Sequence, residues 1–456
     1  MRELRDRIEA ALKGHRADYI EIRIEEAEGA RITYRGRELE DIGRSTSVGG
    51  CVRALVKGGW GFVSFNNLTR LREKVALAVR QARLAGSERS QLAPIEPMVD
   101  IVPPFIGKVN PLEVPLARKK DLLDGYNEII WGTPGITTSV MGYSDGIRRV
   151  AFATSEGAYI EQSKIDVSFR FSAMARADSD VQQAAMSIGA NGDYSVVQDL
   201  QQQVKEAAGR AVALLKAPYV KGGEYTVILD PILAGVFTHE AFGHLSEADF
   251  VYENDRMKEI MVLGRKFGPP ILNIVDGAAV PALRGSFKYD DEGVPATRTR
   301  LIKEGVLVGR LHSRETAGRM GEKPTGNARA LDWRFPPIVR MTNTYIERGP
   351  VSFDDMLADI KEGVYARNWY GGMTSMEQFT FSAGEAYMVR NGKVAEILRP
   401  VMLSGNVFTT LANVEAIGND LSMNQGGGCG KGGQIPLPVS DGSPHIRIRN
   451  VLVGGK

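Results

Sequence analysis

The chain has 456 residues, of which 43% are hydrophobic and 25% are charged, the composition of an ordinary globular protein. This length predicts two domains, because a single core rarely grows so large. A formal net charge of +2 gives no reason to expect nucleic acid or an anionic membrane as a partner. The charged N-terminus and the lack of an apolar run of about 18 residues predict a cytoplasmic protein without a signal peptide or membrane span.

The first half predicts two successive units of helix, antiparallel strands and helix. Residues 1–90 show this order once, and residues 113–217 repeat it. Between them, residues 91–112 contain five prolines and predict a surface linker. Four separate strands are expected in the second unit, at 137–143, 150–154, 158–163 and 166–176. We therefore expect an N-terminal α+β domain, residues 1–217, built from a duplicated helix, sheet and helix unit.

The second half, residues 218–456, predicts a β-rich domain that carries one conspicuous helix. A buried-type strand at 225–229 leads to Pro231, and proline is suited to the first turn of a helix. From residue 270 onward short strands and turns dominate. Two hairpins are expected, around Glu304-Gly305 and around Asn391-Gly392, and Asn-Gly is typical of type I′ turns.

The most informative stretch follows the strand at 225–229, where residues 238–244 read Thr-His-Glu-Ala-Phe-Gly-His. The chain has only five histidines, and two of them, His239 and His244, flank Glu240 here. The related His-Glu-x-x-His pattern of zinc peptidases supplies two metal ligands and a glutamate that activates water. This stretch therefore predicts a metal site, against the alternative of two ordinary histidines on a helix.

The two histidines stand five residues apart, one more than in the zinc-peptidase pattern. On a regular α-helix, positions five apart differ by roughly 140° around the axis, whereas positions four apart differ by about 40°. One π-type turn, with i→i+5 hydrogen bonding, would bring both rings back to one face. Gly243 could ease such a distortion. The spacing thus predicts a π-type turn near residues 241–243.

A catalytic metal site needs a third protein ligand and an open position. Four acidic candidates lie near the second histidine, namely Glu247, Asp249, Glu253 and Glu259. The distant candidate is Cys429, in the glycine-rich stretch 425–433. A thiol in an exposed, flexible loop is liable to oxidation unless it has a use such as metal binding, and the alternative is an incidental surface cysteine. The only other cysteine, Cys51, lies in an apolar, strand-like run and is expected to be a small buried side chain.

Five segments together resemble the TldD/PmbA (TldD/TldE) family of metallopeptidases, and the likeness extends over essentially the whole chain. They are THEAFGH at 238–244, GSFKYDDEGVP at 285–295, PTGN at 324–327, RMTNTYI at 340–346 and CGKGGQ at 429–434. Within this family, TldD-type subunits keep the histidine pair and the glutamate, whereas TldE/PmbA-type partners lack them. This chain keeps them, so it resembles the catalytic type.

The resemblance implies that His239, His244 and Cys429 bind one divalent metal, with Glu240 as the catalytic base. Zinc is the first expectation for this metal and iron is the alternative. The resemblance also implies a dimer that encloses the active sites, either a homodimer or a heterodimer with a TldE/PmbA-type paralogue.

We therefore expect a metalloprotease that hydrolyses unfolded or short peptides by a metal-activated water with Glu240 as general base. Three further residues are candidates for substrate binding, namely His312, Tyr289 and Arg340. Two other functions stay open. One is a non-hydrolytic peptide-binding or assembly subunit with a structural metal, which the presence of Glu240 disfavours because a structural site needs no base. The other is a small-molecule metal-dependent amidohydrolase.

Overall fold

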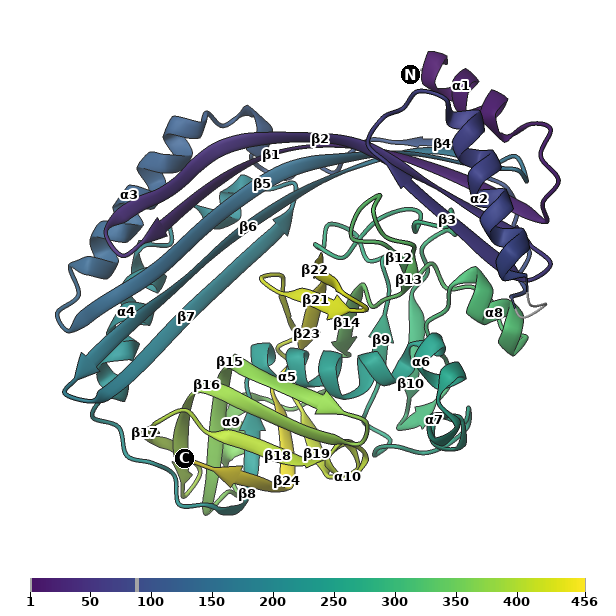
Figure 1. Ribbon diagram of the computed structural model, residues 1–456. Coiled ribbons are helices and arrows are strands. Elements are labelled where there is room, and N and C mark those ends of the chain that lie inside the picture. Colours follow the sequence, from purple (N-terminus) through teal and green to yellow (C-terminus); the bar gives the residue numbers. More distant parts are fainter. Residues whose placement is uncertain (1, 87–89, 456) are drawn as a thin grey trace.

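The computed structural model describes residues 2–86 and 90–455. Its N-terminal part is one long, curved sheet that arches over the C-terminal part (Figure 1). The strands of this sheet are β1 Tyr19–Arg35, β2 Glu38–Val56, β3 Gly59–Phe65, β4 Val99–Val102, β5 Ile136–Thr154, β6 Tyr159–Ala177 and β7 Asp180–Asn191. They run in the order β3-β2-β1-β5-β6-β4, with β7 also paired to β6. Both predicted α+β units therefore contribute to a single sheet.

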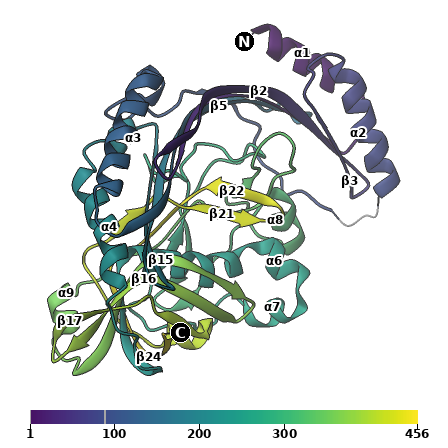
Figure 2. The ribbon, with the colours of Figure 1, turned by 60° about the vertical axis from the view of Figure 1, so that its left-hand side comes forward.

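Two helix pairs cover the outer side of this sheet at its two ends (Figure 2). They are α1 Arg2–Leu12 with α2 Leu71–Ala85, and α3 Leu116–Trp131 with α4 Gln201–Leu214. The side chains of β6 point alternately to the two faces of the sheet, which explains how the sheet packs against the helices on one side and the C-terminal part on the other. The odd-numbered residues of β6, such as Val167 and Phe169, join the core under α3 and α4, whereas Gln162 and Lys164 face the C-terminal part and bond to it.

The structure corrects the predicted strands of the second unit. Residues 137–154 form one strand, β5, where two were expected, and residues 159–177 form one strand, β6. Gly146, in the middle of β5, lies opposite Gly29 of β1, and a Cβ at Gly146 would approach the Glu28 carbonyl oxygen to 2.5 Å. This close pairing with β1 keeps the middle of β5 extended, although its residues are typical of a turn. The expected linker at 91–112 also contains a strand, β4, which pairs with β6 in parallel.

The C-terminal part contains a closed ring of five strands, in which β15, β8, β24, β18 and β16 pair in turn and β16 returns to β15. Its strands, with β17 and β19 attached, are β8 Gly223–Leu229, β15 Glu362–Ser375, β16 Gln378–Arg390, β17 Lys393–Leu398, β18 Met402–Asn406, β19 Val414–Ile417 and β24 Ile446–Gly454. A second sheet contains β9 Ile274–Asp276, β10 Thr299–Lys303, β11 Val306–Leu307, β14 Asn343–Ile346, β20 Ser422–Asn424 and β23 Ser440–Ser443. Two further strand pairs are β12 Ala328–Arg329 with β13 Ile338–Val339, and β21 Gly428–Lys431 with β22 Gln434–Pro438.

The two predicted hairpin turns are confirmed. Glu304 and Gly305 have φ values of 51° and 79°, and Asn391 and Gly392 have 49° and 76°, so each turn has positive φ at both central residues. The predicted α+β class with a β-rich C-terminal half is confirmed as well. We retain the boundary between residues 217 and 218 as a proposal.

Helix α5, Pro231–Thr238, packs between the closed ring and the second sheet, against β15, β14, β20 and β23. Pro231 occupies its first turn as predicted, and the Asp230 carboxylate accepts a hydrogen bond from the Leu233 amide at 2.8 Å. The remaining C-terminal helices are α6 Ala248–Glu253, α7 Asp255–Ile260, α8 Arg314–Met320, α9 Phe353–Leu357 and α10 Val407–Ala412. Among residues 2–86 and 90–455, no helix has the length and apolar character that crossing a membrane requires.

Candidate metal centre

The predicted π-type turn is confirmed. Residues His239–Gly243 form one π-helical turn directly after α5, and the His244 amide donates to the His239 carbonyl, an i→i+5 bond. The turn brings the rings of His239 and His244 within 5.3 Å of each other, centroid to centroid, at an interplanar angle of 85°. Two histidines that a regular helix would direct apart therefore lie side by side.

The sequence predicts that Gly243 eases the distortion of the backbone, but the structure shows a steric reason for glycine at this position. The Gly243 φ of −58° and ψ of −52° are ordinary helical values that any residue adopts, so conformational freedom is not what the position requires. Instead, a Cβ at Gly243 would lie 2.0 Å from the sulfur of Met341, which is fully buried. The position needs glycine because Met341 packs directly against the backbone of the turn.

Replacing Gly243 with alanine is therefore expected to destabilise the protein by about 1–3 kcal/mol, the usual effect of forcing extra volume into a packed core. Urea or thermal unfolding of the full chain measures the change. Gly209→Ala is the matched control, since Gly209 lies in α4 with no atom within 4 Å of its added Cβ, and a helical alanine there is expected to be neutral or stabilising. Equal stabilities of the two variants would contradict this account.

Cys429 lies in a strand and not in an exposed loop, which corrects the predicted setting of this thiol. It belongs to β21, it is only 3% exposed, and it pairs with Leu437 of β22. The glycines beside it allow this close packing, because a Cβ at Gly428 or at Gly430 would lie 2.8 Å from a side-chain carbon of β22. As predicted, Cys51 is buried, in β2.

The structure brings together His239, His244 and Cys429. One ligand atom from each residue lies within 4.8 Å of the others, and the Cys429 Sγ is 3.5 Å from the His244 Nε2. Burial opposes ionisation of the Cys429 thiol, but the two imidazoles outweigh it and lower the pKa of this thiol to about 4. The thiolate, which is the form that binds metals, therefore dominates at neutral pH.

A group of three charged side chains, Glu247, Asp249 and Lys431, orients the second histidine of this cluster. The carboxylate of Glu247 accepts from the Nδ1 of His244 at 3.0 Å, which turns the Nε2 of His244 toward Cys429. The same Glu247 oxygen lies 2.9 Å from the Nζ of Lys431, which also binds Asp249 at 2.7 Å. Burial would raise the pKa of Glu247, but His244 and Lys431 lower it to about 2. Lys431 thereby links the strand of the thiol to the segment that follows the histidines.

Two carboxyl groups lie within electrostatic reach of His239. The side chain of Glu240 is half-buried, and its carboxylate forms no hydrogen bond with any residue in 2–86 or 90–455. Asp441, on β23, is buried and accepts from the Asn424 amide at 3.0 Å. Burial raises the pKa of Asp441 to about 6, with His239 acting against this and the charge of Glu240 adding to it. The sequence alone assigns a role to neither Asp441 nor Lys431. Lys431 stands in the CGKGGQ segment, but nothing local shows that it pairs with Glu247, and Asp441 belongs to none of the five segments.

The remaining sequence candidates lie in other surroundings. Among the four acidic candidates for the third ligand, Glu247 and Asp249 have the partners described above, whereas Glu253 and Glu259 are exposed on α6 and α7. The three proposed substrate-binding residues are all buried. Both ring nitrogens of His312 have partners at 3.1 Å, Thr316 and Glu322, and the hydroxyl of Tyr289 donates to Asp100 at 2.8 Å. Arg340 donates to the Gln434 carbonyl at 3.2 Å.

Comparison with known protein families accounts for most of the chain. Residues 20–85 match PmbA/TldA metallopeptidase domain 1, residues 109–215 match the central domain, and residues 222–455 match the C-terminal domain. The chain belongs to the PmbA/TldD family of metallopeptidases. The resemblance deduced from the five sequence segments is therefore confirmed.

Relatives agree with this assignment over nearly their whole length. A metalloprotease of Synechocystis is 52% identical over 96% of this chain and 95% of its own. The zinc metalloprotease TldD homolog of Saccharolobus solfataricus is 31% identical over 96% of this chain and 97% of its own. The crystal structure of TldE from Thermococcus kodakarensis covers 100% of both chains with a TM-score of 0.76 at 18% identity, which shows a shared fold. As a member of this family, the chain is a metalloprotease that depends on a metal cofactor.

Proposed function

We propose that the chain hydrolyses peptide bonds of unfolded or short peptides, with one zinc ion held by His239, His244 and Cys429 and with Glu240 as general base. The observation that supports this most strongly is the convergence of two imidazoles and a thiol within 4.8 Å, beside a carboxylate that makes no hydrogen bond to the described residues. Iron is the alternative metal, since imidazole and thiolate ligands suit both.

The residues fit a bound metal for two reasons that concern their own chemistry. The His239 Nδ1 is buried and has no hydrogen-bond partner among the described residues, and such an atom is costly unless something binds there. The Cys429 thiol has a lowered pKa, and a thiolate with two imidazoles is a ligand set that zinc accepts. When bound, the metal supplies Lewis acidity, which polarises a peptide carbonyl and lowers the pKa of water.

The protein groups then have distinct tasks in hydrolysis. A Glu240 carboxylate oxygen accepts a proton from the attacking water and delivers it to the nitrogen of the leaving amine. One water is consumed, the carbonyl carbon to nitrogen bond breaks, and the products are a carboxylate and an amine. Glu247 keeps His244 in one orientation through the 3.0 Å contact to Nδ1.

The proposed substrate and partner rest on the family resemblance and not on the geometry of the site. We propose that substrate peptides are unfolded or short, and that the chain acts as a dimer with a second copy of itself or with a TldE-type paralogue. Of the sequence candidates for substrate binding, we retain Arg340, whose Nε and Nη2 atoms have no hydrogen-bond partner among the described residues. The imidazole of His312 is committed to Thr316 and Glu322, and the hydroxyl of Tyr289 is committed to Asp100.

Removal of the metal is expected to abolish cleavage of an unfolded protein, and one equivalent of zinc or iron(II) is expected to restore it. The test uses the full chain stripped with a chelator, a permanently unfolded substrate and the same substrate in its folded form. Metal analysis before stripping shows which ion the purified protein carries. Undiminished cleavage by the stripped chain would refute a metal-dependent mechanism, and equal cleavage of the folded substrate would refute the proposed substrate class.

A further inference from the structure

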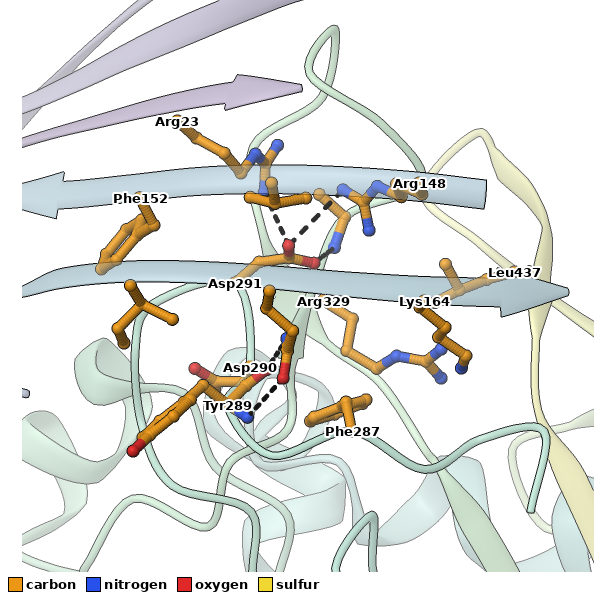
Figure 3. Close-up of a pocket in the computed structure, with 14 residues that line it drawn as sticks. Arg23, Arg148, Phe152, Lys164, Phe287, Tyr289, Asp290, Asp291, Arg329 and Leu437 are labelled. Carbon is orange, nitrogen blue, oxygen red and sulfur yellow. Dashed lines mark hydrogen bonds and ion pairs between the residues drawn. The ribbon is translucent and has the colours of Figure 1, made fainter. Parts of the chain in front are cut away.

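A cavity of about 70 Å³ lies between the sheet of β1, β5 and β6 and the loops of the C-terminal part (Figure 3). Its wall includes four basic side chains from distant parts of the chain: Arg23, Arg148, Lys164 and Arg329. A larger cavity of about 390 Å³ adjoins it and shares Gln162, Lys164 and Phe287 with it. The larger cavity is lined mainly by apolar residues such as Val102, Phe105 and Pro281. We call the smaller one the cationic pocket.

The acidic groups of the cationic pocket do not balance its bases. Asp291 lies 3.4 Å from Arg23 and 3.5 Å from Arg148, and Arg148 also pairs with Glu25 at 2.7 Å. Figure 3 draws the two contacts of Asp291 as dashed lines. The carboxyl of Asp290 accepts from three backbone amides. Within residues 2–86 and 90–455, Lys164 and Arg329 form no ion pair, and their polar atoms donate only to backbone carbonyls. Two cations therefore converge on the pocket without a carboxylate partner.

Several buried nitrogen atoms around the cationic pocket also lack partners in the described chain. Among the residues that line it, they are the Nε and Nη1 atoms of Arg23 and the Nε atom of Arg148; the Nη1 atom lies 3.4 Å from Asp291 but forms no hydrogen bond with any described residue. A buried charge without a partner is strongly destabilising, as is an unsatisfied N–H group. An anion in the pocket would give Lys164 and Arg329 the charged partner that they lack in the described part of the chain.

The cationic pocket lies directly beyond the strand pair that carries the candidate thiol. Leu437, which lines the pocket, is paired with Cys429 across the β21–β22 hairpin, and Arg329 donates to the carbonyl of the next residue, Pro438, at 2.7 Å. Neighbouring strands are about 4.8 Å apart and an extended peptide advances about 3.3 Å per residue. A peptide bound at the metal centre would therefore reach the pocket within a few residues.

We propose that the cationic pocket binds a carboxylate of the peptide substrate, either its C-terminal carboxylate or an acidic side chain close to the cleaved bond. The adjoining apolar cavity would take a neighbouring side chain. This inference rests on the proposed peptidase function and adds a selectivity for acidic groups to it. Guanidinium and ammonium groups pair strongly with carboxylates, which is the chemical basis of the selectivity.

Lys164 should make this binding depend on pH. Its burial and the positive charges of Arg329, Arg284 and Arg148 lower the pKa of Lys164 to about 7, while Asp166 acts in the opposite direction. A bound carboxylate favours protonated Lys164 and raises its pKa. Carboxylate binding is therefore strongest below pH 7 and weakens as the pH rises through the pKa of Lys164 in the complex.

The test measures binding of fluorescein-labelled, unstructured peptides of glycine, serine and leucine to the full chain carrying Glu240→Gln, so that the probes are not cut. One pair of probes differs only in a free or amidated C-terminus. A second pair, both amidated, differs only in one internal Glu or Gln. In at least one pair, the acidic probe is expected to bind about tenfold more tightly at pH 6.5, and the pair that differs identifies which carboxylate binds.

Lys164→Gln is expected to remove this preference, and Lys164→Arg to keep it while abolishing its decline above pH 7. Lys205→Gln is the matched control, because Lys205 is exposed on the outer helix α4, and it is expected to change nothing. Equal affinities within both probe pairs would overturn the proposal, even without any Lys164 variant. Cleavage by the unmodified chain is measured separately, so that a carboxylate preference in a chain that cuts no peptide would refute the peptidase function and leave the pocket standing.

Discussion

Replacing Glu240 with glutamine is expected to lower the rate of peptide cleavage by about 10²- to 10⁴-fold, the contribution that a positioned general base typically makes. Glutamine has nearly the same shape as glutamate, but its amide cannot accept the proton of the attacking water. The side chain is half-buried and makes no hydrogen bond within the described chain, so the substitution leaves no buried partner unsatisfied. Stability and metal content should therefore stay unchanged.

The rate is measured on an internally quenched peptide under saturating conditions, beside metal analysis of the same preparation. Glu253→Gln provides the matched control, since Glu253 is an exposed carboxylate on α6, and this variant should retain full activity. Full cleavage by Glu240→Gln would exclude Glu240 as the base. A loss of metal together with activity would instead make Glu240 a ligand. An unmodified chain that holds metal but cuts no peptide would favour the non-hydrolytic alternative.

Replacing Cys429 with alanine should weaken metal binding by at least about 100-fold, because even the loss of a residue that only orients a ligand typically costs 10- to 100-fold. The variant loses the anionic member of a cluster in which the other two groups are imidazoles. That negative charge helps to raise the pKa of His239, and together with Glu247 the pKa of His244, against the opposing effect of burial. The loss of the anionic ligand disfavours a bound cation, and cleavage should fall with metal content.

Titration of the stripped protein with zinc in the presence of a competing chelator measures this change. Cys51→Ala is the matched control, because Cys51 is the other buried free thiol and lies in β2, opposite Arg23 of β1 and outside the cluster of the two histidines. It should bind metal as tightly as the unmodified chain does. Undiminished binding by Cys429→Ala would remove Cys429 from the ligand set and return the search for the third ligand to the carboxylates near His239, of which Asp441 is buried.

Local features of this protein were predictable because the forces that produce them act between residues close in sequence. The five-residue spacing of His239 and His244 required a π-type turn if both rings were to meet, and the turn is present. Asn391-Gly392 predicted its own hairpin because few other residue pairs tolerate positive φ twice in succession. Pro231 marked the start of α5 for the same kind of local reason.

Strand lengths were less predictable, because a strand depends on the strand beside it. The middle of β5 has a sequence suited to a turn, yet its pairing with β1 and the contact between Gly146 and Gly29 keep it extended. The prolines of residues 91–112 indicated a linker, and β4 forms there only because β6 offers a free edge.

By itself, the sequence determined the family, the candidate metal-binding motif and the distorted turn that holds the two histidines. The family resemblance named Cys429 as the third ligand, and the tertiary structure then showed it against His244, a contact between residues 185 positions apart. Only the tertiary structure placed Lys431 against Glu247, buried Asp441 within electrostatic reach of His239, and gathered the bases of the cationic pocket from β1, β5, β6 and β12. These contacts form between segments that are far apart in sequence, and they depend on burial and charge. Such contacts produce no periodic pattern or fixed spacing in the sequence, so they could not be predicted from the arrangement of residues along the chain.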